Sequence, residues 1–143
     1  MKTEIIKLIT GALRSDEYPQ IYGQLRTTDG YCASAVAGDV LMKRFPYLGM
    51  QWGHTGGEHA IILGESDFYI EGLPAELLTE AGFCPLCGIQ GSVGGKLFPI
   101  ATLNDNMKMS FSFLADAIER AYESLYSSNR STDCLVGHGL DGD

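Results

Sequence analysis

The chain has 143 residues, the size of one ordinary domain, and its 45% hydrophobic and 20% charged residues are typical of folded globular proteins. The 18 acidic and 10 basic residues give a formal net charge of −8, which argues against direct nucleic-acid binding because phosphate backbones repel an acidic surface. No apolar run approaches the roughly 20 residues that a membrane helix needs, so we expect no membrane partner.

The first residues do not have the pattern of a signal peptide. Met1-Lys2-Thr3-Glu4 carries an acid and leads into no apolar segment with a small-residue cleavage site. We therefore expect a cytoplasmic protein, whose four cysteines are reduced unless a metal holds them.

Apolar residues recur at helical spacing in two segments of the first third of the chain. One begins at the capping residue Thr3 and ends near residue 15, since the residue before Pro19 avoids helical geometry. The other covers residues 33–44, and its small side chains would let another backbone pack closely. Between them, residues 24–27 are predicted to form a short strand.

The middle of the chain favours strands. Apolar runs at residues 60–63 and 68–70 flank a polar turn and predict a β-hairpin. Residues 74–81 predict a short helix, with proline at its start and Gly82 at its end. Residues 83–95 are rich in glycine and are predicted to be a long irregular loop.

The last predicted helix begins at Ser110 and carries a continuous apolar stripe as far as Leu125. Ser, Asn, Gly and Asp dominate afterwards, which predicts a flexible tail over residues 127–143. We therefore expect a single domain over residues 1–126 with an α+β fold, in which three main helices pack on a small antiparallel β-sheet.

Four stretches match, in order, the sequence pattern of one protein family. They are residues 12–20 (ALRSDEYPQ), 25–26 (LR), 29–33 (DGYCA) and 103–119, which contains LND, SF and LADAIE. The family pattern is ALRSGxYxQ, then LR with DGYCxLGVL, then an LP helix, then LNDxGxSFxxIADxIE. The chain thus resembles a group of small uncharacterised proteins from bacteriophages, cyanophages among them, and from bacteria. It departs from the pattern at Ser34-Ala35 and in the longer segment 106–109.

The resemblance covers roughly residues 10–122. It implies a phage origin and action inside an infected cell, where small acidic phage proteins often bind and redirect a host protein.

One set of residues has the chain order of a thiol enzyme. Cys32 starts a predicted helix, where unpaired amides and the helix dipole favour a thiolate. His59 starts a predicted strand and Glu71 ends the next one, as in papain-like and transglutaminase-like hydrolases and acyltransferases. His59 would take the thiol proton, Glu71 would orient the imidazole, and Gln20 or Gln24 would stabilise an oxyanion. A buried structural cysteine is the alternative, and we favour it.

A second set has the spacing of zinc ligands. Cys84-Pro-Leu-Cys87-Gly is a common half of a zinc site, and Cys134 with His138 would complete a Cys3His set. Reduced thiols without metal are the alternative, and no other cofactor is expected.

Two further clusters allow both a structural and a binding role. Residues 103–106 are predicted to form a turn that positions the last helix, and Asp105 there could pair with Arg14 or Arg26. Phe45, Tyr47 and Trp52 are core residues if buried, and a partner-binding patch if exposed.

These observations favour a non-catalytic accessory protein of phage type that binds a host or viral protein in the host cytoplasm. The acidic surface suits a basic partner protein, and binding to it could compete with nucleic acid for the same partner. The alternative function is a thiol hydrolase or acyltransferase that uses Cys32, His59 and Glu71.

Overall fold

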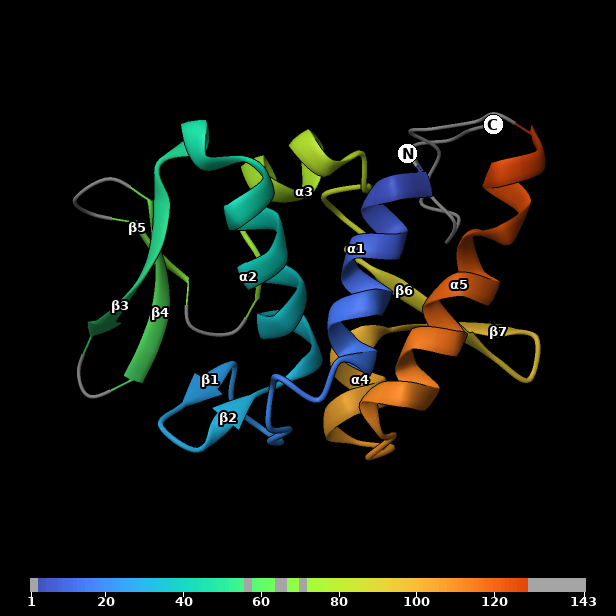
Figure 1. Ribbon diagram of the computed structural model, residues 1–143, viewed down its shortest axis with the longest axis horizontal. Helices are drawn as coiled ribbons and strands as arrows, with labels where there is room; N and C mark the ends of the chain where they lie inside the picture. Colours follow the sequence, from blue (N-terminus) through green and yellow to red (C-terminus); the bar gives the residue numbers. More distant parts are fainter. Residues whose placement is uncertain (1–2, 56–57, 64–66, 70–71, 129–143) are drawn as a thin grey trace.

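The structure is a computed structural model that describes residues 3–55, 58–63, 67–69 and 72–128 (Figure 1). It is an α+β fold, as predicted, with α-helices and antiparallel strands. In the described residues the helices are α1 (Thr3–Arg14), α2 (Ala33–Arg44), α3 (Ala75–Ala81), α4 (Ile100–Asp105) and α5 (Phe111–Ser128), with a 3-10 turn, η1 (Pro46–Leu48). The strands are β1 (Arg26–Thr27), β2 (Gly30–Tyr31), β3 (Met50–Thr55), β4 (Glu58–Leu63), β5 (Asp67–Tyr69), β6 (Gln90–Val93) and β7 (Lys96–Pro99).

Helix α2 lies at the centre of the molecule. Figure 1 shows the sheet of β3, β4 and β5 on one side of α2 and helices α1 and α5 on the other. All residues of α2 from Ala33 to Asp39 are buried, which explains why small side chains dominate this segment. A Cβ atom on Gly38 would lie 2.8 Å from Leu73 Cδ2 and 3.2 Å from Ile61 Cδ1, so neighbouring side chains fill the space above this glycine.

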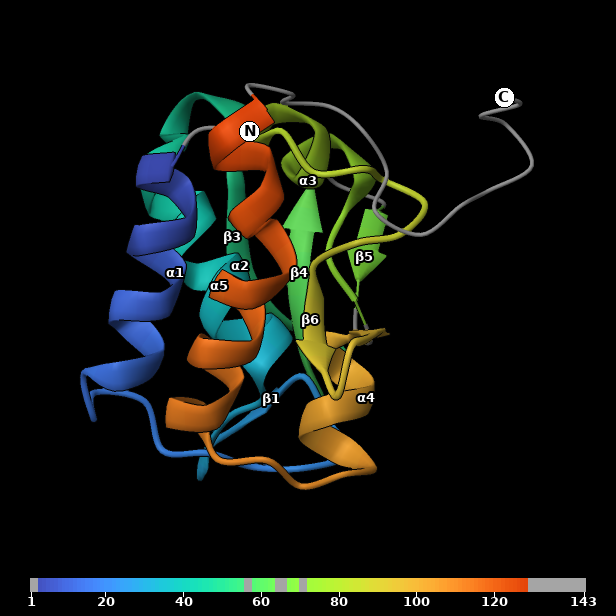
Figure 2. The same ribbon diagram turned by 90° about the vertical axis from the view of Figure 1, so that its right-hand side faces the viewer.

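Helices α1 and α5 pack against each other and bury their apolar stripes. Ile6 and Ile9 of α1 and Leu114 and Ile118 of α5 are completely buried in the same hydrophobic core. Figure 2 shows α5 between α1 and β6, and α5 contacts both. The predicted helices over residues 3–15, 33–44 and 74–81 and the helix after Ser110 are confirmed within one or two residues. No helix in the described ranges is long and apolar enough to cross a membrane.

The prediction of one small sheet is wrong. The described strands form three separate antiparallel sheets, β1–β2, β3–β4–β5 and β6–β7. The predicted hairpin is confirmed as β4 and β5, but β3 adds a further strand that pairs along the whole of β4. The β3–β4–β5 sheet lies on one side of α2 and the β6–β7 hairpin lies on the other, so the two are not joined (Figure 1).

The predicted loop over residues 83–95 is also partly wrong. Its second half is β6, which pairs with β7 through the two-residue turn Gly94-Gly95. Both glycines have positive φ (61° and 81°), the geometry that two-residue hairpin turns need. Residues 103–105, predicted as a turn, form the second half of helix α4, which follows Pro99. Residues 127–128 end α5, and the rest of the predicted tail lies outside the described residues.

Candidate functional site

The side chain of Asn104, on α4, is completely buried and uses all of its hydrogen-bonding capacity. Its Oδ1 accepts from Gln20 Nε2 at 2.9 Å and from the backbone N–H of Ala33 at 3.2 Å. Its Nδ2 donates to the Ile21 carbonyl at 2.9 Å and to Asp105 Oδ1 at 2.7 Å. This Asn104 network joins α4, the first turn of α2 and the connection between α1 and β1.

Two neighbours of Asn104 extend the network to the protein surface. Gln20 Nε2 also donates to the Met109 carbonyl at 2.7 Å, and Asp105 Oδ1 accepts from the Gly23 N–H at 2.9 Å. The segment 20–23 and the segment 104–109 are therefore fixed to each other. In Figures 1 and 2 both segments lie at the same end of the molecule.

Large apolar side chains are exposed on and beside these segments. Tyr22 is 44% exposed, Met107 is 45% exposed, and Phe113, in the first turn of α5, is 64% exposed. Lys108 Nζ lies 4.5 Å from the centre of the Tyr22 ring, so the two segments also touch at the surface. We call Tyr22, Met107 and Phe113 the Tyr22 surface.

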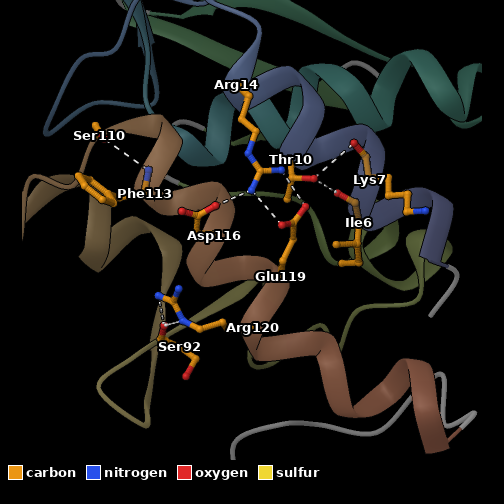
Figure 3. Close-up of polar contacts among 10 residues, drawn as sticks. All are labelled: Ile6, Lys7, Thr10, Arg14, Ser92, Ser110, Phe113, Asp116, Glu119 and Arg120. Atoms are coloured by element: carbon orange, nitrogen blue, oxygen red, sulfur yellow. Dashed lines mark hydrogen bonds and ion pairs between the residues drawn. The ribbon is translucent and has the colours of Figure 1, made fainter.

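A cavity of about 310 Å³ opens beside this network, between the end of α1 and the start of α5. Gln20 and Tyr18 line it from the connection after α1, and Ser110, Phe111 and Ser112 line it from α5. The Ser110 hydroxyl accepts from the Phe113 N–H at 3.4 Å, so Ser110 caps α5 as predicted (Figure 3).

An ion-pair cluster joins α1 to α5 close to this cavity. Arg14 donates to Asp116 Oδ1 at 2.6 Å and to both carboxylate oxygens of Glu119 at 2.8 and 2.9 Å (Figure 3). The bond from Arg14 keeps the pKa of Glu119 below its usual range. The predicted pairing of Asp105 with Arg14 or Arg26 is wrong, since Asp105 accepts from Gly23 and Asn104 and makes no ion pair with a described residue.

Asp39, on α2, has a buried carboxylate that accepts from three side chains. It accepts from Tyr18 at 2.6 Å, from Trp52 Nε1 at 3.0 Å and from Lys43 Nζ at 2.9 Å. Burial alone raises the pKa of Asp39, but these three donors outweigh burial and bring the pKa below its usual value. Burial and the Asp39 carboxylate raise the pKa of Tyr18.

Cys32 and His59, two of the residues predicted for a thiol enzyme, occupy different environments. Cys32 is the N-cap residue of α2 but is only 4% exposed within the hydrophobic core. Burial raises the pKa of its thiol, although backbone N–H groups of α2 oppose this effect. His59 lies on β4, where its ring is 4.2 Å from the His54 ring, and Glu71 lies outside the described residues. Gln20 belongs to the Asn104 network, and Gln24 is exposed. This environment favours the structural role of Cys32.

The predicted zinc ligands are only partly described. Cys84 and Cys87 lie in the turn between α3 and β6, where the Gly88 N–H donates to the Cys84 carbonyl at 2.9 Å, and Cys84 is a free thiol. Cys134 and His138 lie outside the described residues. Within the described part of the chain, no three His, Cys, Asp or Glu side chains gather as metal ligands. Zinc binding stays a prediction.

The three aromatic residues predicted as a partner-binding patch do not share one environment. Phe45 is 8% exposed and belongs to the core. Trp52 is half-buried against the core and donates to Asp39. Tyr47 is 64% exposed, and its hydroxyl donates to Glu80 on α3. Phe45 and Trp52 therefore have the core role that was the alternative to partner binding. Of the three residues, only Tyr47 has a largely exposed side chain.

The Tyr22 surface was not predicted from the sequence. One signal was available, because segment 106–109 is longer than the family pattern and contains Met107 between polar residues. The apolar stripe of α5 also leaves Phe113 out of its face, next to the buried Phe111 and Leu114.

Comparison with known protein families, with curated proteins and with solved structures finds no match to this chain.

Proposed function

We propose that the protein is non-catalytic and binds a host or viral protein through the Tyr22 surface. The observation that carries this proposal is the exposure of three large apolar side chains, Tyr22, Met107 and Phe113, on the two joined segments and in the first turn of α5. Exposed aromatic and methionine side chains are enriched in the cores of protein–protein interfaces.

The rigidity of the segments behind this surface supports the proposal. Hydrogen bonds flank Tyr22 on both sides, because Asn104 donates to the Ile21 carbonyl and Asp105 accepts from the Gly23 N–H. Gln20 also donates to the Met109 carbonyl. A surface that is already ordered loses less conformational entropy when a partner binds. The Asn104 network therefore suits a binding surface, because it holds exposed side chains in place without involving them.

The net charge of the chain and its resemblance to phage proteins indicate which class of partner to expect. The net charge of −8 favours a basic protein over nucleic acid. The resemblance to phage proteins favours a partner in the cytoplasm of the infected cell. The buried, high-pKa thiol of Cys32 favours binding over thiol catalysis, since a thiolate is the reactive form.

The test is affinity capture from bacterial lysate with matched variants of the full chain. One variant carries Tyr22→Ser, Met107→Ser and Phe113→Ser. The control carries Leu8→Ser, Tyr47→Ser and Leu86→Ser, which replace three apolar side chains that are also between 42% and 65% exposed. We expect the first variant to retain less than a tenth of a captured protein that the control retains in full.

Equal loss in both triple variants would mean that capture follows general surface hydrophobicity. A captured protein that neither variant affects would place the binding surface elsewhere. Either result would overturn the proposal.

A further inference from the structure

Arg26, on β1, has a guanidinium group that is held between two aromatic rings. The guanidinium carbon lies 4.6 Å from the centre of the Tyr31 ring and 4.9 Å from the centre of the Trp52 ring. Tyr31 and Trp52 meet edge to face, with ring centres 6.2 Å apart, and Tyr18 meets Tyr31 in the same way at 4.8 Å. These contacts fix the guanidinium through cation–π attraction.

Among the residues that the structure describes, this guanidinium has no hydrogen-bond or ion-pair partner. Its Nε is buried and unpaired, and across the described ranges Arg26 makes no ion pair. The carboxylate that is bonded to this aromatic cluster, that of Asp39, already accepts from Tyr18, Trp52 and Lys43. A buried guanidinium donor without an acceptor is costly and calls for an explanation.

Two histidines lie on the sheet that β1 packs against. Strand β1 packs against β4, and His59 on β4 is the cross-strand partner of His54 on β3. The two rings are 4.2 Å apart. Burial, His54 and Arg26 all lower the pKa of His59, because burial and neighbouring positive charge disfavour the imidazolium form.

We propose that Arg26, His54 and His59 form a binding site for a phosphate group. A phosphate monoester carries about two negative charges and three terminal oxygens, so it can accept from a guanidinium and two imidazoles at once. Such a ligand would supply the acceptor that Arg26 lacks. The bis-histidine pair alone could hold a metal cation, but the adjacent guanidinium repels one. This proposal does not depend on the proposed protein-binding function.

The test is a titration of the full chain with inorganic phosphate, followed by NMR of the arginine Nε–Hε and histidine ring signals. We expect saturable shifts at Arg26, His54 and His59. Arg26→Gln should weaken binding at least tenfold, and His54→Gln should weaken it several-fold. Because His54 is exposed, His54→Gln leaves the core intact and keeps the test valid if Arg26→Gln does not fold.

Lys96→Gln is the matched control, since it removes one positive charge from an exposed position on β7. Equal weakening by Lys96→Gln, or shifts spread over other basic residues, would overturn the proposal, as would the absence of saturable shifts. Parallel titrations with AMP and phosphoserine identify the source of the phosphate. If AMP or phosphoserine binds more tightly than inorganic phosphate, the natural ligand is a phosphate group on that kind of molecule. If all three bind equally, the natural ligand is free phosphate.

Discussion

The side-chain amide of Gln20 donates a hydrogen bond of 2.9 Å to Asn104 Oδ1, across 84 positions of the chain. Both residues belong to the stretches on which the predicted resemblance to phage proteins rests, YxQ and LND. In this fold they connect the segment after α1 to α4.

Asn104→Asp is expected to destabilise the protein by about 3 kcal/mol. The substitution removes both donors of Asn104 and buries a carboxylate directly against Asp105 Oδ1. Urea unfolding measures the loss. Asn106→Asp is the control, because Asn106 is exposed and the added charge there meets solvent. Equal midpoints for the two variants would contradict the importance of the network.

Tyr18→Phe is expected to cost about 1.5 kcal/mol at pH 7, because the hydroxyl donates to the ionised, buried Asp39. The matched variant is Tyr47→Phe, whose hydroxyl bonds Glu80 at the exposed surface, and it should leave the unfolding midpoint unchanged. Equal losses in the two variants would show that burial of the carboxylate does not set the strength of the bond.

The pH dependence of stability has a defined sign at Asp39. Its folded-state pKa lies below its unfolded value, so the unfolded chain takes up the proton first. The stabilisation is present above about pH 4 and is lost as the pH falls further. The Asp39→Asn variant should therefore lose less stability between pH 7 and pH 3 than the unchanged protein does. Urea midpoints between pH 7 and pH 3 measure the difference.

Cysteine labelling separates the two roles of Cys32. In the folded protein we expect iodoacetamide to modify the half-buried Cys84 before the buried Cys32, whose thiol has a raised pKa. Cys32 should react at a similar rate to Cys84 only after denaturation, and His59→Ala should not change this. Fast labelling of Cys32 at pH 6 that depends on His59 would support the thiol-hydrolase alternative.

Two glycines are expected to respond in opposite directions to alanine. A Cβ atom on Gly30 would lie 2.2 Å from the Pro19 carbonyl oxygen, so Gly30→Ala should destabilise by about 2 kcal/mol. Gly11 is in α1 with no atom near the added methyl group, so Gly11→Ala should stabilise by about 1 kcal/mol. Thermal unfolding of both variants checks the signs, and a stabilised Gly30→Ala would refute the close approach of Pro19.

The helices were predictable because α1 and α5 repeat apolar residues at helical spacing, and α2 shows it with small residues. Strand β3 was not predictable, because few residues of the segment Met50–Thr55 have a high propensity for strands. Gly53 lies in β3 because Ile62 of β4 occupies the space of a side chain there, which is a contact that no local pattern contains. The β6–β7 hairpin was predictable from Gly94-Gly95.

The candidate sites were harder to predict than the fold. Asn104 joins segments that are more than 70 positions apart, and Arg26 meets Tyr31 locally but Trp52 only through the packing of β3. Sequence patterns identified polar residues at 103–106 but not the partners of these residues. Sequence patterns also placed Cys32 at the start of a helix. They could not show that Cys32 is buried there, and burial decides the reactivity of its thiol.

The pairing of Arg14 with Glu119 spans 105 positions, nearly the full described chain. During synthesis α1 leaves the ribosome before α5, the helix that covers its apolar stripe. A nascent chain that stops before residue 111 therefore exposes Ile6 and Ile9 to chaperones and proteases. The hydrophobic core of this fold is therefore complete only once α5 has been synthesised.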